Sequence, residues 1–197
     1  RGGWGGGGGG AGGGERGGGG PRGGVGGGGW ARRGVARAAG AGSGRGVGAG
    51  RGARHRPRVL VATQTTGVEV GADPAGDMVR LTPLVVVEPE PEELWHLAAA
   101  LSAPAVSAMA ARLSVGAARS AGRIKLSARQ VADLPVPTDR TAWDEGAGLA
   151  MALHEAGRTA TQEAWLEFGE TMGRAYGTPD GDLLEWWWAR HPARSRA

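Results

Sequence analysis

The sequence contains no cysteine and no apolar run of about 18 residues, the length needed to cross a membrane. The absence of cysteine excludes disulfides, thiolate zinc sites and cysteine nucleophiles, and it favours an intracellular, cytoplasmic setting. The amino end also lacks the apolar segment typical of a signal peptide. We therefore expect no membrane partner.

Several other residue types are scarce. The chain has no asparagine and only one isoleucine, one phenylalanine, one tyrosine and one lysine, whereas arginine occurs 22 times. This composition avoids residues with AT-rich codons. Ile124 and Lys125 nevertheless stand side by side. Because the two residues occur here despite the bias, we infer that this position requires these side chains.

Glycine and positive charge are concentrated at one end. The first 52 residues contain 29 of the 41 glycines, and residues 1–58 contain eleven arginines against one acid. The remainder has 12 basic and 18 acidic residues. Because runs of glycine lose too much backbone entropy on folding, we expect residues 1–56 to form a disordered Gly/Arg-rich tail. The rest, roughly 140 residues, is the size of one domain.

The tail has two interpretations. Arg-Gly-Gly triplets begin at Arg1, Arg16 and Arg22, and Trp4 and Trp30 are available to stack on bases, as in a nucleic-acid tether. The triplets are few and irregular, however. This irregularity favours a compositionally biased linker, or a misassigned reading frame in a GC-rich gene, over a nucleic-acid tether.

Short apolar segments followed by helical periodicity predict an α+β fold. Expected strands lie at 59–61, 68–70, 78–81 and 84–88, with a turn at 71–77. From Pro91 the apolar spacing changes to three and four residues. This spacing predicts a helix to Leu101 and a second helix, capped by Ser102 or Ala103, to Leu113. A small antiparallel or mixed sheet should therefore precede the helices.

The strongest local signal lies at 124–137. Ser127 and Gln130 have the spacing of a capping box, and Leu126 and Val131 occupy the two positions of a hydrophobic staple around it. Pro135 should end the short helix. We expect a short strand, a capped helix and a rigid exit.

Three further helices are expected towards the carboxy end. They run from Asp139 or Thr141 to Gly157, from Thr159 to Gly177, and from Pro179 to Arg190. Thr159 and Gln162 repeat the capping-box spacing in the second. The third contains Trp186, Trp187 and Trp188. Three adjacent tryptophans cannot all face one core, so at least one should be partly exposed or cover a partner.

Catalytic motifs are absent. His154-Glu155 begins like the helix of a zinc protease, but Arg158 stands at the second ligand position. There is no Gly-x-Ser-x-Gly elbow and no phosphate-binding loop, and the acids at 88–93 suit a helix start. The remaining histidines, His55, His96 and His191, have no metal-like spacing. We predict neither a catalytic nor a metal site on this chain.

The capped turn has a possible binding role. Free amides at a helix start attract anions, and a neighbouring cation adds to the attraction. We therefore predict phosphate contacts by a set of polar and basic side chains: Arg119, Arg123, Lys125, Ser127 and Arg129. The alternative is a solvated basic turn without a ligand.

Four segments together resemble one protein family. They are Arg58–Thr65, Glu93–Ser107, Ile124–Pro137 and Tyr176–Trp188. In this order they look like the carboxy-terminal specificity region of actinobacterial TaqI-like N6-adenine DNA methyltransferases, which is itself similar to recognition units of type I restriction specificity subunits. The resemblance implies a DNA target-recognition module at 57–137 and a helical extension at 138–197.

The chain departs from the complete enzyme. The family's Asn/Asp-Pro-Pro-aromatic motif is missing, and only Asp73-Pro74-Ala75 comes near it. The resemblance therefore implies a recognition part that is not catalytic on its own. The catalytic domain would lie elsewhere, in cis or in trans, and S-adenosylmethionine would bind there, with no cofactor on this chain.

The expected partner is double-stranded DNA, read in a sequence-specific manner for a restriction-modification type system. Gln64 suits adenine, and Thr65 lies beside it. Two other functions remain open. The chain is alternatively a non-catalytic protein-interaction module that uses the Trp-rich last helix, or an RNA-binding protein of the Arg-Gly-Gly type.

Overall fold

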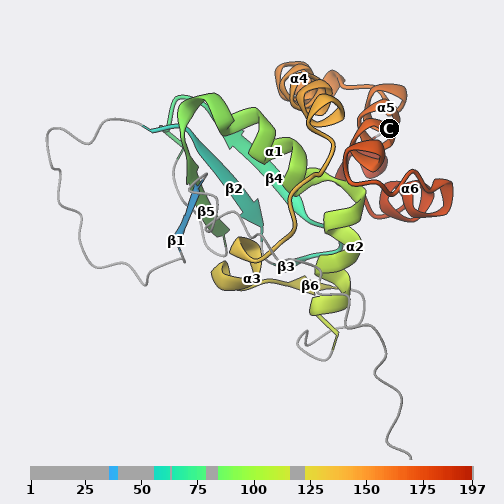
Figure 1. Ribbon diagram of the computed structural model, residues 1–197, viewed down its shortest axis with the longest axis horizontal. Coiled ribbons are helices and arrows are strands. Elements are labelled where there is room, and N and C mark those ends of the chain that lie inside the picture. The colour runs from blue at the N-terminus through green and yellow to red at the C-terminus, as the bar shows by residue number, and fades with distance from the viewer. Residues whose placement is uncertain (1–35, 40–55, 63, 79–83, 116–122, 197) are drawn as a thin grey trace, which may run out of the picture.

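The computed structural model describes residues 36–39, 56–62, 64–78, 84–115 and 123–196 (Figure 1). Two small antiparallel sheets are followed by helices, which confirms the predicted α+β class. Most of the predicted tail, 1–35 and 40–55, lies outside the described residues.

The larger sheet has four strands in the order β1-β5-β2-β4, and all neighbours are antiparallel. Its strands are β1 (Ala36–Ala39), β2 (Arg58–Ala62), β4 (Glu69–Asp73) and β5 (Leu84–Pro89). In the central strand β2, Val59 and Val61 are completely buried. Leu60 and Ala62, which alternate with them, are less buried, as expected for a strand with one face on the core. The apolar run at 59–61 predicted this strand.

Three details differ from the sequence prediction. Strand β4 continues to Asp73, so the turn begins later than residue 71. Met78 lies in no strand, and the rest of the predicted strand at 78–81 is outside the described residues. Strand β1 forms within the predicted tail and pairs with β5, with Ala36 opposite Pro89. An edge strand is held by backbone hydrogen bonds, so it needs no side-chain pattern.

An ion pair fixes the turn after β4. Arg58 and Asp73 face each other across β2 and β4, and their side chains meet at 2.8 Å. The carboxylate also accepts hydrogen bonds from the backbone N–H groups of Asp77 and Met78. Burial works to raise the pKa of Asp73, but the hydrogen bonds from Met78, Arg58 and Asp77 hold it below its usual value.

Helix α1 (Leu94–Ser102) lies on the larger sheet, and α2 (Pro104–Leu113), which follows it, extends beside β6 (Ile124–Lys125) (Figure 1). A 3₁₀ turn (Pro91–Glu93) leads into α1, and α2 follows after an extended Ala103, which serves as its N-cap. No single described helix is long and apolar enough to cross a membrane. The two successive helical segments Pro91–Ser102 and Pro104–Leu113, which are bent by 61° to each other, are long and apolar enough only when they are taken together. Most apolar side chains of α1 are, however, buried within the protein.

The carboxy-terminal helices are α4 (Arg140–Ala156), α5 (Gln162–Ala175) and α6 (Gly181–Trp188). Asp139 caps α4 by accepting a hydrogen bond from the N–H of Ala142. Of the two predicted caps, Asp139 and Thr141, the structure therefore has the first. The predicted Thr159 cap is wrong, because the chain continues from Gly157 as a 3₁₀ turn to Thr159. Thr161 supplies the equivalent hydroxyl two residues later and accepts the N–H of Ala164.

The last helix also begins later than predicted, with Asp180 as its N-cap. Trp187 and Trp188 are buried, whereas Trp186 is half-buried, with the Arg190 guanidinium 4.4 Å from its ring centroid. The expectation that at least one of the three is partly exposed is confirmed. His191 lies 4.2 Å, centroid to centroid, from Trp165 and 4.7 Å from Trp187, so this helix is held by aromatic packing.

One hydrophobic core joins the sheet to all of these helices. Helix α4 packs along α1, and α5 packs along α4 (Figure 1). The phenol oxygen of Tyr176, just after α5, lies 3.2 Å from the carbonyl of Ala100 and 3.0 Å from that of Pro135. Its O–H can donate to one of them at a time. Residues 138–188 therefore pack directly on residues 57–137.

Candidate nucleic-acid interface

A two-stranded sheet brings together two segments that lie far apart in the sequence. Strand β3 (Gln64–Thr65) pairs with β6 (Ile124–Lys125), with Gln64 opposite Lys125 and Thr65 opposite Ile124. Side chains directly opposite each other in an antiparallel pair share a face. Ile124 is buried, whereas Gln64 and Lys125 are exposed. The amide and the ammonium groups are therefore neighbours on the solvent side.

Ser114 holds β6 from its other edge. The buried Ser114 hydroxyl accepts a hydrogen bond from the Lys125 N–H at 2.9 Å and donates to the Lys125 carbonyl at 3.2 Å. The Ser114 hydroxyl thus forms the hydrogen bonds with the Lys125 backbone that a residue of a neighbouring strand would otherwise form. The sequence analysis missed Ser114, because no local spacing connects it to Lys125.

The capping box that follows β6 is confirmed. The Ser127 hydroxyl oxygen accepts the N–H of Gln130 at 3.3 Å, and the Gln130 side-chain oxygen accepts the N–H of Ser127 at 2.9 Å. Helix α3 (Ala128–Ala132) is only five residues long. Because the cap satisfies its own donors within so short a helix, any attraction for phosphate comes from the neighbouring cationic side chains. Ser127 shapes the turn.

Removing this cap should destabilise the protein modestly. Ser127→Ala is expected to lower the free energy of unfolding by about 1 kcal/mol, because the N–H of Gln130 loses its acceptor. Urea unfolding measures the loss. Ser195→Ala is the control, since that exposed hydroxyl donates only to the carbonyl of Pro192. An equal effect of both changes would contradict a capping role.

Three cationic side chains surround the turn. Arg123, Lys125 and Arg129 are all exposed, and Arg119 lies outside the described residues. Arg129 has a 93% exposed side chain and lies 3.9 Å from the carboxylate of Asp133, a solvated pair of little strength. The Thr65 hydroxyl donates to the carbonyl of Gly67 and is half-buried. Of the predicted residues, the pairing of β3 with β6 thus brings Gln64 and Thr65 next to Lys125. Arg123 and Arg129 lie on either side of Lys125 in the chain.

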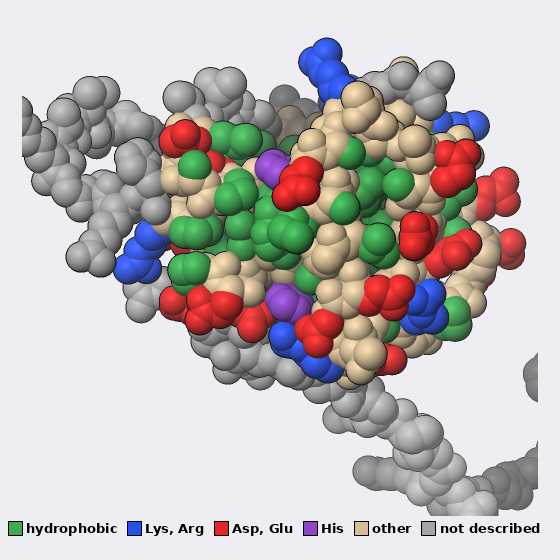
Figure 2. Space-filling model, turned by 90° about the horizontal axis from the view of Figure 1, so that it is seen from above, with side chains coloured by type: hydrophobic (Ala, Val, Ile, Leu, Met, Phe, Trp, Pro, Cys, Tyr) green, Lys and Arg blue, Asp and Glu red, His purple; other side chains and the backbone are tan. Residues whose placement is uncertain are grey.

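Charge is distributed unevenly along residues 94–190. Residues 94–137 contain five basic side chains and one acid, whereas residues 138–190 contain four basic side chains and ten acids. In Figure 1, β3, β6 and α3 lie at the end away from α4 and α5. Figure 2 shows the molecule from above, the side on which α4 and α5 lie in Figure 1, and many acidic side chains are visible there. A polyanion would therefore be repelled from the α4–α5 side.

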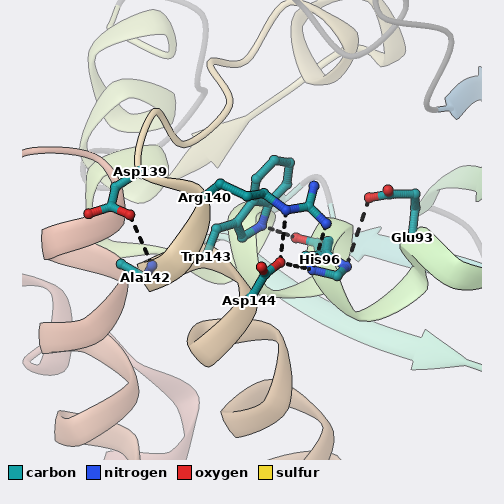
Figure 3. A network of polar contacts seen from close by, with 7 residues as sticks. All are labelled: Glu93, His96, Asp139, Arg140, Ala142, Trp143 and Asp144. Atoms are coloured by element: carbon teal, nitrogen blue, oxygen red, sulfur yellow. Dashed lines mark hydrogen bonds and ion pairs between the residues drawn. The ribbon is translucent and has the colours of Figure 1, made fainter.

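A second polar cluster joins α1 to the start of α4 (Figure 3). His96 Nε2 lies 2.8 Å from Asp144 Oδ1, and Arg140 Nε donates to the same oxygen at 2.8 Å. Trp143 Nε1 donates to the His96 carbonyl at 2.8 Å, and Glu93 lies 3.8 Å from His96 Nδ1. The hydrogen bond with His96, together with Arg140, holds the pKa of Asp144 below its usual value. These contacts fix two helices to each other.

Within the described residues, no three or more His, Asp or Glu side chains are grouped to hold a metal ion. Among known proteins, the sequence matches no family model and no curated protein.

Proposed function

We propose that this chain binds duplex DNA through the surface formed by Gln64, Arg123, Lys125 and Arg129, here called the β3–β6 surface. The observation that carries the proposal is the pairing of Gln64 with Lys125 on an exposed face. Such a face places a group able to read bases next to one that attracts phosphate.

The two kinds of side chain have different tasks. Lysine and arginine contacts to phosphate supply affinity and position the protein, but they do not distinguish sequences. A side-chain amide can form two hydrogen bonds with the N6 and N7 atoms of adenine in the major groove. Gln64 is the amide at this surface, so it is the residue to which we assign sequence preference.

The finer proposal is a target-recognition module for N6-adenine methylation in a restriction-modification type system. It rests on the resemblance of the four sequence segments described above. A catalytic domain in cis or in trans would supply S-adenosylmethionine binding and methyl transfer, and this chain would place that domain on its target. Such a system acts on cytoplasmic DNA.

The alternative role of the Trp-rich helix as a protein-docking site receives less support. Trp187 and Trp188 are buried in the chain's own core, and Trp186 is half-buried with Arg190 over its ring. The helix therefore leaves little indole surface for a partner.

Lys125→Ala should weaken binding to all duplex sequences about equally. Removing one phosphate contact is expected to reduce the slope of log affinity against log salt by roughly one unit. Because Lys125 is exposed, the melting temperature should barely change. Fluorescence anisotropy titrations over a salt series measure both affinity and slope. Arg158→Ala removes the same charge near the acidic helices and is the control, so it should leave the salt slope unaltered. Unchanged DNA binding by Lys125→Ala would contradict the proposal.

Gln64→Ala, by contrast, should change the sequence preference and leave the salt dependence of binding unaltered. Loss of a two-bond contact to one base is expected to cost about 1–3 kcal/mol of discrimination at one position of the site. The salt slope should stay as in the wild type, since no charge is removed. Selection from a random duplex pool, followed by sequencing, measures the preference. A preference that is identical in wild type and variant would remove Gln64 from the reading role.

A further inference from the structure

A pocket of about 320 Å³ lies between β4, α1, α4 and α5, apart from the β3–β6 surface. Its walls are aromatic and aliphatic: Trp95, Leu153, Trp165, Phe168 and Val70 border it. Phe168 is only 1% exposed, whereas both tryptophans are half-buried. The pocket therefore has a buried apolar floor and two partly exposed indole rings on its walls.

The charge at this pocket comes from the guanidinium of Arg158. His154 and Arg158 are the titratable side chains that border it, both are exposed, and no carboxylate is among the lining residues. Arg158 makes no ion pair with any described residue. His154 lies with its ring centroid 5.2 Å from that of Trp95. Because both groups are exposed, they lie at the mouth of the pocket.

The polar group on the pocket wall is already engaged. The Ser102 hydroxyl donates to the carbonyl of Ala98 at 2.8 Å within its own helix. A ligand therefore meets an apolar interior and a cationic entrance. A guanidinium at the rim of an apolar pocket is suited to a carboxylate, which it can hold by charge-assisted hydrogen bonds.

We propose that this pocket binds a small planar aromatic carboxylate, with its ring against the Trp95 and Trp165 indoles and its carboxylate at Arg158. The volume is at the lower end of ligand pockets and accommodates a ligand of one or two fused rings. The proposal does not depend on DNA binding, since the pocket shares no residue with the β3–β6 surface.

Isothermal titration calorimetry with 2-naphthoate and its uncharged counterpart 2-naphthamide tests this assignment on the full chain. We expect one saturable site for naphthoate, with an affinity about tenfold above that for the amide, because only the acid pairs with Arg158. Arg158→Gln should bring the two affinities to within about threefold of each other by weakening naphthoate alone. Arg112→Gln removes the same charge from α2, outside the pocket, and should change neither.

A second variant tests the location. Ala150 is half-buried and borders the pocket, so Ala150→Phe should fill it and abolish binding of both probes. Circular dichroism and the melting temperature establish that the variant is folded. Equal affinities for naphthoate and naphthamide in the wild type, no saturation by naphthoate at millimolar concentration, or full binding by a folded Ala150→Phe protein would each overturn the proposal. DNA titrations of the same variants should match the wild type, which keeps the two proposals separable.

Discussion

Asp73→Asn is expected to lower the free energy of unfolding by about 3–5 kcal/mol, the usual cost of removing one partner of a buried ion pair. The carboxylate is 1% exposed, and it accepts two N–H groups of Arg58 as well as two backbone N–H groups. The amide carries no charge and has only one oxygen to accept these donors. Arg58, itself 9% exposed, would keep a buried positive charge without its partner.

Urea unfolding at pH 7 measures this loss. Asp133→Asn is the matched control, because Asp133 pairs with Arg129 at 3.9 Å on the exposed surface and should change stability by less than about 0.5 kcal/mol. Combining Asp73→Asn with Arg58→Met should restore part of the loss, since no charge then remains buried. Equal effects of the Asp73 and Asp133 changes would show that the ion pair does not stabilise the fold.

The same carboxylate makes stability depend on pH. Because the pKa of Asp73 is lowered in the folded state, its contribution is present above the unfolded value of about 3.9 and is lost as pH falls through the folded value. The wild type should therefore lose stability below about pH 4 more steeply than Asp73→Asn. Unfolding curves between pH 7 and pH 2.5 compare the two slopes.

The sequence predicted those parts of the fold that depend on neighbouring residues. Short apolar runs predicted β2 and β5, and the three-residue spacing of Ser127 and Gln130 predicted the capping box. At Thr159 the same spacing misled, because Gly157 adopts a positive φ of 56° and the chain makes a 3₁₀ turn before α5. Two possible caps two residues apart cannot be separated by spacing alone.

The arrangement of the candidate site depended on contacts that the sequence does not signal. Different features of the sequence point to Gln64 and Lys125: the amide of the first, and the charge of the second beside a capped turn. Their pairing through β3 and β6 joins segments about sixty positions apart, so no periodicity reveals it. The same holds for Ser114, whose hydroxyl substitutes for a strand partner of Lys125. Backbone pairing over such distances is decided by the packed core.

Leu101→Ala should lower the free energy of unfolding by about 3–4 kcal/mol, because Leu101 is 0% exposed in α1, the helix between the sheet and α4. Deleting its side chain removes buried apolar surface and leaves a cavity that helices fixed by the His96–Asp144 and Trp143–His96 contacts cannot readily close.

The adjoining helix offers the same substitution at an exposed site. Leu113, the last residue of α2, is 44% exposed, so Leu113→Ala should cost less than about 1 kcal/mol. Chemical denaturation of both variants at pH 7 gives the comparison, with similar m-values expected for each. Because the two changes delete the same atoms from neighbouring helices, the difference between them measures burial rather than helix propensity. Equal losses would mean that α1 is not part of the core that unites the sheet with the carboxy-terminal helices.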